Sequence, residues 1–157
     1  MDYIIREIKE SEYHLLNDFL YEAIFIPEGV KPPPREIINS PELQVYVADF
    51  GRSKDDRCLV AEDDGMIVGA AWVRIMNDYG HIDGKTPSFA ISLYKEYRSL
   101  GIGTNLMERM LSELKENGYK QASLAVQKAN YAVKMYQKLG FEVFDENEEE
   151  YIMVNRL

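Results

Sequence analysis

The chain has 157 residues, of which 46% are hydrophobic, 11% aromatic and 29% charged, which is typical of one folded domain rather than of a disordered chain or a collagen. The formal net charge of −9 disfavours nucleic acid as a partner, because phosphate backbones bind clusters of Lys and Arg. One cysteine and two histidines exclude an intramolecular disulfide and a Cys/His zinc site, so no metal is expected. The first residues lack the apolar core of a signal peptide, and no stretch is apolar enough to span a membrane. We therefore expect a cytoplasmic protein.

The first third of the chain predicts a strand, a helix and a proline-rich loop. Residues 3–8 form a strand-like run, and apolar residues at helical spacing predict a helix over residues 10–25. Five of the six prolines fall within residues 27–41, which predicts a stiff loop because proline disrupts helices and sheets. A short helix is predicted around residues 43–50.

The middle third predicts three strands. Residues 58–62 and 66–75 flank an Asp64-Gly65 pair, which is typical of a β-hairpin turn. A polar loop over residues 77–86 precedes the third strand, at residues 88–94.

The last third alternates helices and strands. Apolar residues that include Met107 and Met110 share one face of a predicted helix over residues 101–117, so we expect both methionines in the core. A strand at 122–126, a helix at 130–139 and a hairpin formed by 141–144 and 151–154 follow. This order of elements predicts a single α/β domain over residues 1–157.

Two glycine-containing segments have features of phosphate-binding loops. Residues 80–86 place three residues between their glycines, where a P-loop needs four, and a strand follows where a P-loop needs a helix, so we interpret them as a turn. The second segment opens the helix at 101–117 and reads Arg98-Ser99-Leu100-Gly101-Ile102-Gly103-Thr104. Its glycines let backbone N–H groups approach an anion, and the helix N-terminus adds partial positive charge. Taken alone, this segment also fits a simple glycine-rich turn.

A second motif lies downstream of the glycine-rich segment at 98–104. It consists of Asn130, then Tyr136 on a predicted helix, then Gly140-Phe141. Together and in this order, the two motifs and the surrounding elements resemble the GCN5-related N-acetyltransferase (GNAT) family over nearly the whole chain. The resemblance implies a mixed, mostly antiparallel sheet of about seven strands with helices on both faces. It also implies a cofactor cleft where two central strands splay apart, and it makes a homodimer plausible.

The resemblance assigns roles to single residues. Leu93 and Tyr94, at a bulge in the strand, would offer backbone groups to the pantetheine arm of acetyl-CoA, and a free N–H there would polarise the thioester carbonyl. Asn130 would bind the pantetheine region, and Tyr136 would protonate the departing CoA thiolate. The pyrophosphate would be held by Arg98, Ser99, Leu100, Gly101, Ile102, Gly103 and Thr104. Without the resemblance, Tyr136 also fits a packing residue on the apolar face of its helix.

The general base is left open by the sequence. Many relatives carry a Glu on the strand before the phosphate loop, but residues 88–93 contain no carboxylate. Asp83, His81 and Glu28 are the candidates, and each also fits a solvated loop residue. Relatives often have proline at the position of Lys95.

Less specific assignments concern the acceptor side. Tyr46 and Tyr79 are candidates for the wall of the acceptor pocket, and Trp72 fits either the core or a cleft wall. We expect the loop at 27–41 and the loop before Ser88 to hold the acceptor.

We therefore expect an acetyl-CoA-dependent N-acetyltransferase that passes an acetyl group directly to a primary amine in a ternary complex. Polyamines, amino acids, aminoglycosides and protein amines remain open as acceptors, and so does a longer acyl group. The alternatives are an acyl-CoA-binding module without catalysis and a P-loop nucleotide binder.

The negative charge is concentrated in one predicted turn. Residues 142–150 contain six acidic residues and no basic one. A polyanion such as CoA is instead favoured by bases on the predicted cofactor side, namely Lys95, Arg98, Lys128, Lys134 and Lys138.

Overall fold

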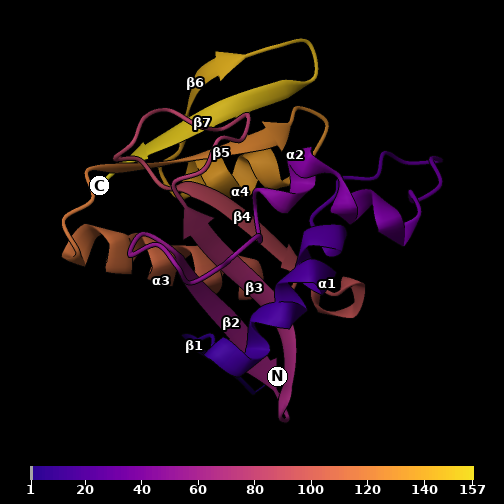
Figure 1. The fold of residues 1–157 in the computed structure, drawn as a ribbon. Helices are drawn as coiled ribbons and strands as arrows, with labels where there is room; N and C mark the ends of the chain where they lie inside the picture. The colour runs from indigo at the N-terminus through magenta and orange to yellow at the C-terminus, as the bar shows by residue number, and fades with distance from the viewer. Residues whose placement is uncertain (1) are drawn as a thin grey trace.

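The strand-like runs of the sequence form one mixed sheet in the computed structural model, which describes residues 2–157. The strands are β1 (Tyr3–Glu7), β2 (Arg57–Asp63), β3 (Met66–Arg74), β4 (Ser88–Leu93), β5 (Gln121–Gln127), β6 (Glu142–Glu146) and β7 (Glu150–Arg156). Their order across the sheet is β1-β2-β3-β4-β5-β7-β6, and all neighbours are antiparallel except β4 and β5 (Figure 1). This arrangement confirms the predicted mixed, mostly antiparallel sheet of seven strands.

Helices cover both faces of the sheet, as predicted. Helices α3 (Ile102–Glu116) and α4 (Ala132–Lys138) pack on one face, and α1 (Leu16–Glu22) and α2 (Pro41–Gln44) lie on the other (Figure 1). No helix among residues 2–157 is both long and apolar enough to cross a membrane.

Two apolar cores result from the alternation of side chains along the strands. Met107 and Met110 on α3 are fully buried on the α3 face, as predicted. Trp72 on β3 points to the opposite face and packs with Leu16 and Phe19 of the α1 region, so it is a core residue.

Three predicted elements differ from the structure. The helix predicted over 10–25 is a 3₁₀ helix (Glu10–Leu15) that leads into α1, and α1 ends at Glu22, because in a helix Pro27 could not donate to the Ala23 carbonyl and would clash with it. The stretch at 27–41 is not loop throughout: it contains a 3₁₀ helix (Arg35–Asn39). The short helix predicted around 43–50 spans only Pro41–Gln44, because proline fits the first turn of a helix, and turns follow it to residue 50.

Strands β4 and β5 diverge from a single point of contact. Their only register pair among the described residues is Ser88 opposite Ser123, whereas β3 and β4 share six pairs and β5 and β7 share seven. The predicted splay between two central strands is therefore present.

The divergence leaves backbone groups of β4 without a strand partner. The Tyr94 N–H donates to the Val68 carbonyl at 2.9 Å, and backbone groups alternate sides along an antiparallel strand. The N–H groups of Ile91 and Leu93 therefore point away from β3, toward the opening beside β5. The predicted bulge at Leu93 and Tyr94 is wrong: the β3–β4 register is regular through Leu93, and the free backbone results from the departure of β5.

Candidate active site

The splay of β4 and β5 opens into a cleft of about 700 Å³, a size typical of small-molecule and cofactor sites. Its walls come from the end of α1 and the loop after it, the end of β4, the start of α3 and the start of α4. Elements from distant parts of the sequence thus meet at one opening, as a cofactor cleft requires.

The glycine loop before α3 forms the wall beside the end of β4. Gly101 has a φ of 87° and directly precedes α3, where glycine adopts the left-handed conformation without strain. The first turn of α3 contains no acidic residue, so the partial positive charge at the helix N-terminus is not neutralised there. This wall therefore suits an anion.

The structure divides the seven predicted residues of this loop into two groups. Leu100 is 54% exposed and Ile102 is fully buried, and the side chains of these two do not line the cleft. Those that line it are Arg98, Ser99, Gly101, Gly103 and Thr104.

Arg98 also connects secondary-structure elements. Its Nε donates to the Leu93 carbonyl at 3.0 Å, and its Nη2 donates to the Glu22 carbonyl at 3.3 Å. The same guanidinium lies 3.9 Å from the Glu22 carboxylate. Arg98 thus holds the end of α1 against the end of β4, while its charge remains at the cleft wall together with that of Lys95.

Leu93 and Tyr94 differ in what they offer to a ligand. The Tyr94 N–H is used by Val68, and the Tyr94 carbonyl accepts a hydrogen bond from the Tyr97 N–H at 2.9 Å. Its ring packs against Phe19, so the structure does not support the predicted role of Tyr94. The N–H of Leu93 faces the splay, and so does the N–H of Ile91, which the sequence analysis did not select. The alternation along β4 would have identified Ile91.

Asn130 and Tyr136 both lie on the wall formed by α4 and the residues before it. The Asn130 Oδ1 accepts a hydrogen bond from the Ala132 N–H at 2.9 Å, which stabilises the start of α4 and leaves its Nδ2 as the group available to a ligand. Tyr136 is 7% exposed, and Phe141 packs edge-on against its ring. Burial raises the pKa of the Tyr136 hydroxyl, so it remains protonated at neutral pH and can donate a proton.

None of the three predicted general-base candidates lines the cleft. Asp83 is exposed, and hydrogen bonds from the Lys85 N–H and the Thr86 hydroxyl lower the pKa of its carboxyl, so it stabilises a turn. Glu28 is exposed in the proline-rich segment, and His81 lies in the loop before β4. The acidic residue that does line the cleft is Glu22, beside Arg98.

The segment at 80–86 does not form a P-loop. A Cβ on Gly80 would lie 3.1 Å from the Ala125 nitrogen and 3.1 Å from the Ser88 Oγ, so this backbone is pressed against β4 and β5. Strand β4 follows the segment where a P-loop needs a helix. The nucleotide-binding alternative is therefore wrong.

Asp78 is a half-buried acidic residue that belongs to none of the sequence motifs. Its Oδ2 accepts a hydrogen bond from the Ser88 hydroxyl at 2.8 Å. Burial raises the pKa of its carboxyl, against the opposing effects of Ser88 and of the nearby Tyr46 hydroxyl. Asp78 belongs to no motif, and only the fold brings it to β4.

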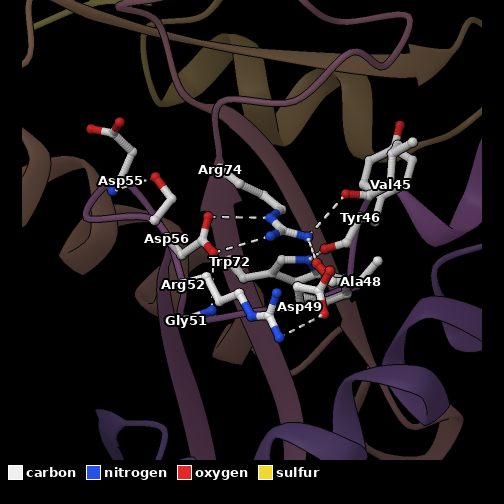
Figure 2. A network of polar contacts seen from close by, with 11 residues as sticks. Val45, Tyr46, Ala48, Asp49, Gly51, Arg52, Asp55, Asp56, Trp72 and Arg74 are labelled. Atoms are coloured by element: carbon white, nitrogen blue, oxygen red, sulfur yellow. Dashed lines mark hydrogen bonds and ion pairs between the residues drawn. The ribbon is translucent and has the colours of Figure 1, made fainter.

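A polar network fixes the segment that carries Tyr46. The Trp72 Nε1 donates to the Tyr46 carbonyl at 2.9 Å, and Arg74 donates to the carbonyls of Val45 and Ala48 (Figure 2). On its other side, Arg74 forms a 3.0 Å ion pair with Asp56, whose side chain is 1% exposed. The network holds the turns after α2 against β3. It therefore places Tyr46 near Asp78, whose charge, together with burial, raises the Tyr46 pKa.

The fold and the cleft define a single α/β domain in which the two central parallel strands diverge beside a cleft that a glycine loop borders. The chain belongs to the acetyltransferase (GNAT) family, whose family model matches residues 18–141.

Individual relatives agree with this family over parts of the chain. It is 33% identical over 91 residues to an N-alpha-acetyltransferase of Sulfurisphaera tokodaii, a match that covers 53% of this chain and 54% of that protein. It is 29% identical over 87 residues to a mycothiol acetyltransferase of Propionibacterium freudenreichii, with 54% of this chain and 27% of that protein covered. The chain thus spans about half or less of the length of these two relatives.

A solved structure extends the likeness of the fold to the whole chain. The PaiA N-acetyltransferase of Thermoplasma acidophilum, solved in complex with coenzyme A, superposes with a TM-score of 0.73 at 20% identity, covering 100% of both chains. At this identity, the likeness establishes the fold.

Proposed function

We propose that the protein transfers the acetyl group of acetyl-CoA directly to a primary amine within a ternary complex. One observation carries this proposal: unpaired backbone N–H groups of β4 and the Tyr136 hydroxyl lie at one cleft, which is bounded by a glycine loop suited to an anion. Family membership and the coenzyme A complex of a structural relative support the proposal.

The residues of the cleft wall fit acetyl-CoA. The cofactor is an elongated polyanion, and the wall offers Arg98, Lys95 and the N-terminus of α3 at the loop that would hold its pyrophosphate. The Asn130 Nδ2 would hold the pantetheine region. When bound, acetyl-CoA supplies the acetyl group as an activated thioester.

Each catalytic role follows from the position of a group in the cleft. The N–H groups of Leu93 and Ile91 are fixed donors that would stabilise negative charge on the thioester carbonyl oxygen, as in an oxyanion hole. The Tyr136 hydroxyl is protonated at neutral pH and would give its proton to the departing sulfur. The amine must lose a proton before it attacks, since free alkyl ammonium groups titrate near 10.4.

We further propose that the acceptor enters beside the proline-rich segment. Val30, Pro32 and Pro33 of this segment line the cleft opposite the α4 side, where they would cover a bound amine. A cytoplasmic location and a homodimer remain predictions from the sequence.

The test is thiol release from acetyl-CoA across a panel of alkyl amines, amino acids, aminoglycosides and peptides. The proposal predicts CoA release that depends on one class of amine, with the acetylated amine identified by mass spectrometry. Tight acetyl-CoA binding without any acetylated amine would instead establish an acyl-CoA-binding module. The absence of a carboxylate on β4 is the one observation that favours that module.

A further inference from the structure

Glu22 is the one acidic residue that lines the cleft among residues 2–157. It is the last residue of α1, and its side chain is 25% exposed, so an acceptor that enters from solvent can reach it. The residues that follow it in the same wall are apolar, namely Ala23, Ile24, Phe25 and Ile26. An amine at this wall therefore meets a single negatively charged group.

The carboxylate of Glu22 accepts no hydrogen bond from the part of the chain that the structure describes. The Arg98 Nη2 donates to the Glu22 carbonyl at 3.3 Å, but it lies 3.9 Å from the carboxylate Oε1, which is too long for a hydrogen bond. A pyrophosphate at the glycine loop would share the same guanidinium, which weakens its attraction for the carboxylate further. The backbone of Glu22 is thus held in place, while its carboxylate is free to accept a hydrogen bond from a substrate.

Glu22 and Tyr136 approach the end of β4 from opposite faces of the sheet. Helix α1, which ends at Glu22, packs on one face, and α4, which carries Tyr136, packs on the other (Figure 1). The Arg98 Nε donates to the Leu93 carbonyl at 3.0 Å, so only the width of one guanidinium separates this part of β4 from the Glu22 carboxylate. Acyl transfer to an amine needs two such groups, one beside the attacking nitrogen and one beside the departing sulfur.

We propose that Glu22 is the general base of the reaction and takes the proton of the attacking amine. This inference rests on the proposed acetyl transfer and supplies the carboxylate that β4 lacks. As the neutral amine forms its bond to the acyl carbon, the nitrogen gains positive charge, which the Glu22 carboxylate stabilises before it accepts the N–H proton. The carbon–sulfur bond breaks, and Tyr136 gives its proton to the sulfur. Glu22 then releases a proton to solvent, and Tyr136 regains one.

The first test compares Glu22→Gln with the wild type, using the amine that gives the fastest CoA release in the acceptor panel. We expect kcat to fall by about 100-fold, the lower end of what a general base contributes. The Kd of acetyl-CoA, measured by calorimetric titration, should not rise, because the variant keeps the backbone carbonyl that Arg98 bonds and removes a negative charge beside an anion site.

Chemical rescue distinguishes a base from a carboxylate that only supports the structure. Glu22→Ala leaves room in a cleft that is open to solvent, so added formate can take the place of the missing carboxylate and accept the proton. We expect formate to raise the kcat of Glu22→Ala by about tenfold and to leave the wild type unchanged.

Glu113→Gln is the matched control. Glu113 is also a glutamate beside an arginine, with the Arg109 Nε 3.4 Å from its carboxylate, and its side chain is 30% exposed, but it lies on α3 and does not line the cleft. This variant should retain the kcat of the wild type. Thermal melting reports whether each variant folds, and Glu22→Gln decides the matter if Glu22→Ala does not.

Three outcomes overturn the inference alone. The first is a Glu22→Gln variant with the kcat of the wild type, and the second is a folded Glu22→Ala variant that formate does not rescue. The third is a Glu22→Gln variant in which acetyl-CoA binding weakens as much as kcat falls, which would show that Glu22 only positions Arg98. The proposed transfer itself fails in a different way, if the wild type binds acetyl-CoA and acetylates no amine of the panel.

Discussion

Tyr136 combines two properties that a proton donor needs. Its ring is 7% exposed and fixed by Phe141, and it lines the same cleft as the free N–H groups of β4. Because burial raises the pKa of its hydroxyl above the ordinary value of 10, the proton is retained across the neutral range. The two interpretations of Tyr136, core residue and acid, are therefore compatible: the packed ring carries a hydroxyl that is protonated at neutral pH.

Tyr136→Phe keeps the packed ring and removes the hydroxyl that would donate the proton. We expect kcat to fall by about 100-fold, the lower end of what general acids contribute, while the Kd of acetyl-CoA stays unchanged. Steady-state rates and calorimetric titration measure the two quantities. Tyr119→Phe, which removes a hydroxyl bonded to Asp55, is the control and should leave kcat unaltered. An unchanged kcat in Tyr136→Phe would remove this residue from the mechanism.

At the scale of elements, α3 has a glycine with a positive φ at each end, a conformation that would be strained for any other residue. Gly101 precedes the helix and Gly118 follows it; both have a φ of 87°, and a Cβ on either would meet nothing within 4 Å. Only the first of them borders the cleft. The two positions therefore separate the effect of backbone strain from the effect on an anion site.

Gly101→Ala and Gly118→Ala should each lower the free energy of unfolding by about 1 kcal/mol, the cost of a left-handed conformation for an L-residue. Only Gly101→Ala should weaken acetyl-CoA binding, by about tenfold, because relaxing the strain turns N–H groups away from the pyrophosphate. Urea denaturation measures the free energy of unfolding of both variants, and calorimetry measures their affinity for acetyl-CoA. Equal affinities in the two variants would show that the loop does not bind the cofactor.

The Arg74 network ties the turns after α2 to β3, and its energetics follow from burial. Arg74→Met leaves the Asp56 carboxylate buried without its partner, so we expect a loss of about 3 kcal/mol in the free energy of unfolding. Arg52, paired with Asp49 at 3.7 Å, is 81% exposed at its side chain. Arg52→Met should therefore change stability by less than about 0.5 kcal/mol. Chemical denaturation measures both variants. Similar losses of stability in the two would show that the buried Arg74–Asp56 pair of Figure 2 stabilises the fold no more than an exposed pair does.

At the scale of the whole molecule, the sequence predicted what depends on local pattern. The helical spacing of the apolar residues around Met107 located α3, and the Asp64-Gly65 pair located the β2–β3 hairpin. The family resemblance added the splayed strands. The cleft residues that matched a motif, such as Asn130 and Tyr136, were found for this reason.

Features that depend on distant parts of the chain could not be predicted. Asp78 gains its position from a hydrogen bond to Ser88 and from the close packing of Gly80, neither of which leaves a repeating pattern in the sequence. Tyr46 owes its position to Trp72 and to Arg74, more than 25 residues away. The assignment of Tyr94 failed because its backbone groups are used within the protein.

Charge is distributed over the molecule in agreement with an anionic cofactor. The acidic residues of 142–149 are exposed on β6 and the turn after it, while Asp78 and Glu150 are half-buried. The cleft wall near α3 instead carries Arg98 and Lys95. The cofactor would thus bind at a basic part of a protein whose net charge is negative.

Initial-rate kinetics test the central claim, direct acetyl transfer within this cleft, most directly. CoA release is measured as acetyl-CoA is varied at several fixed concentrations of an amine that the acceptor panel identifies. Direct transfer in a ternary complex predicts double-reciprocal lines that intersect. Parallel lines, which indicate an acetylated enzyme intermediate, or the absence of amine-dependent CoA release with every amine tested, would contradict it.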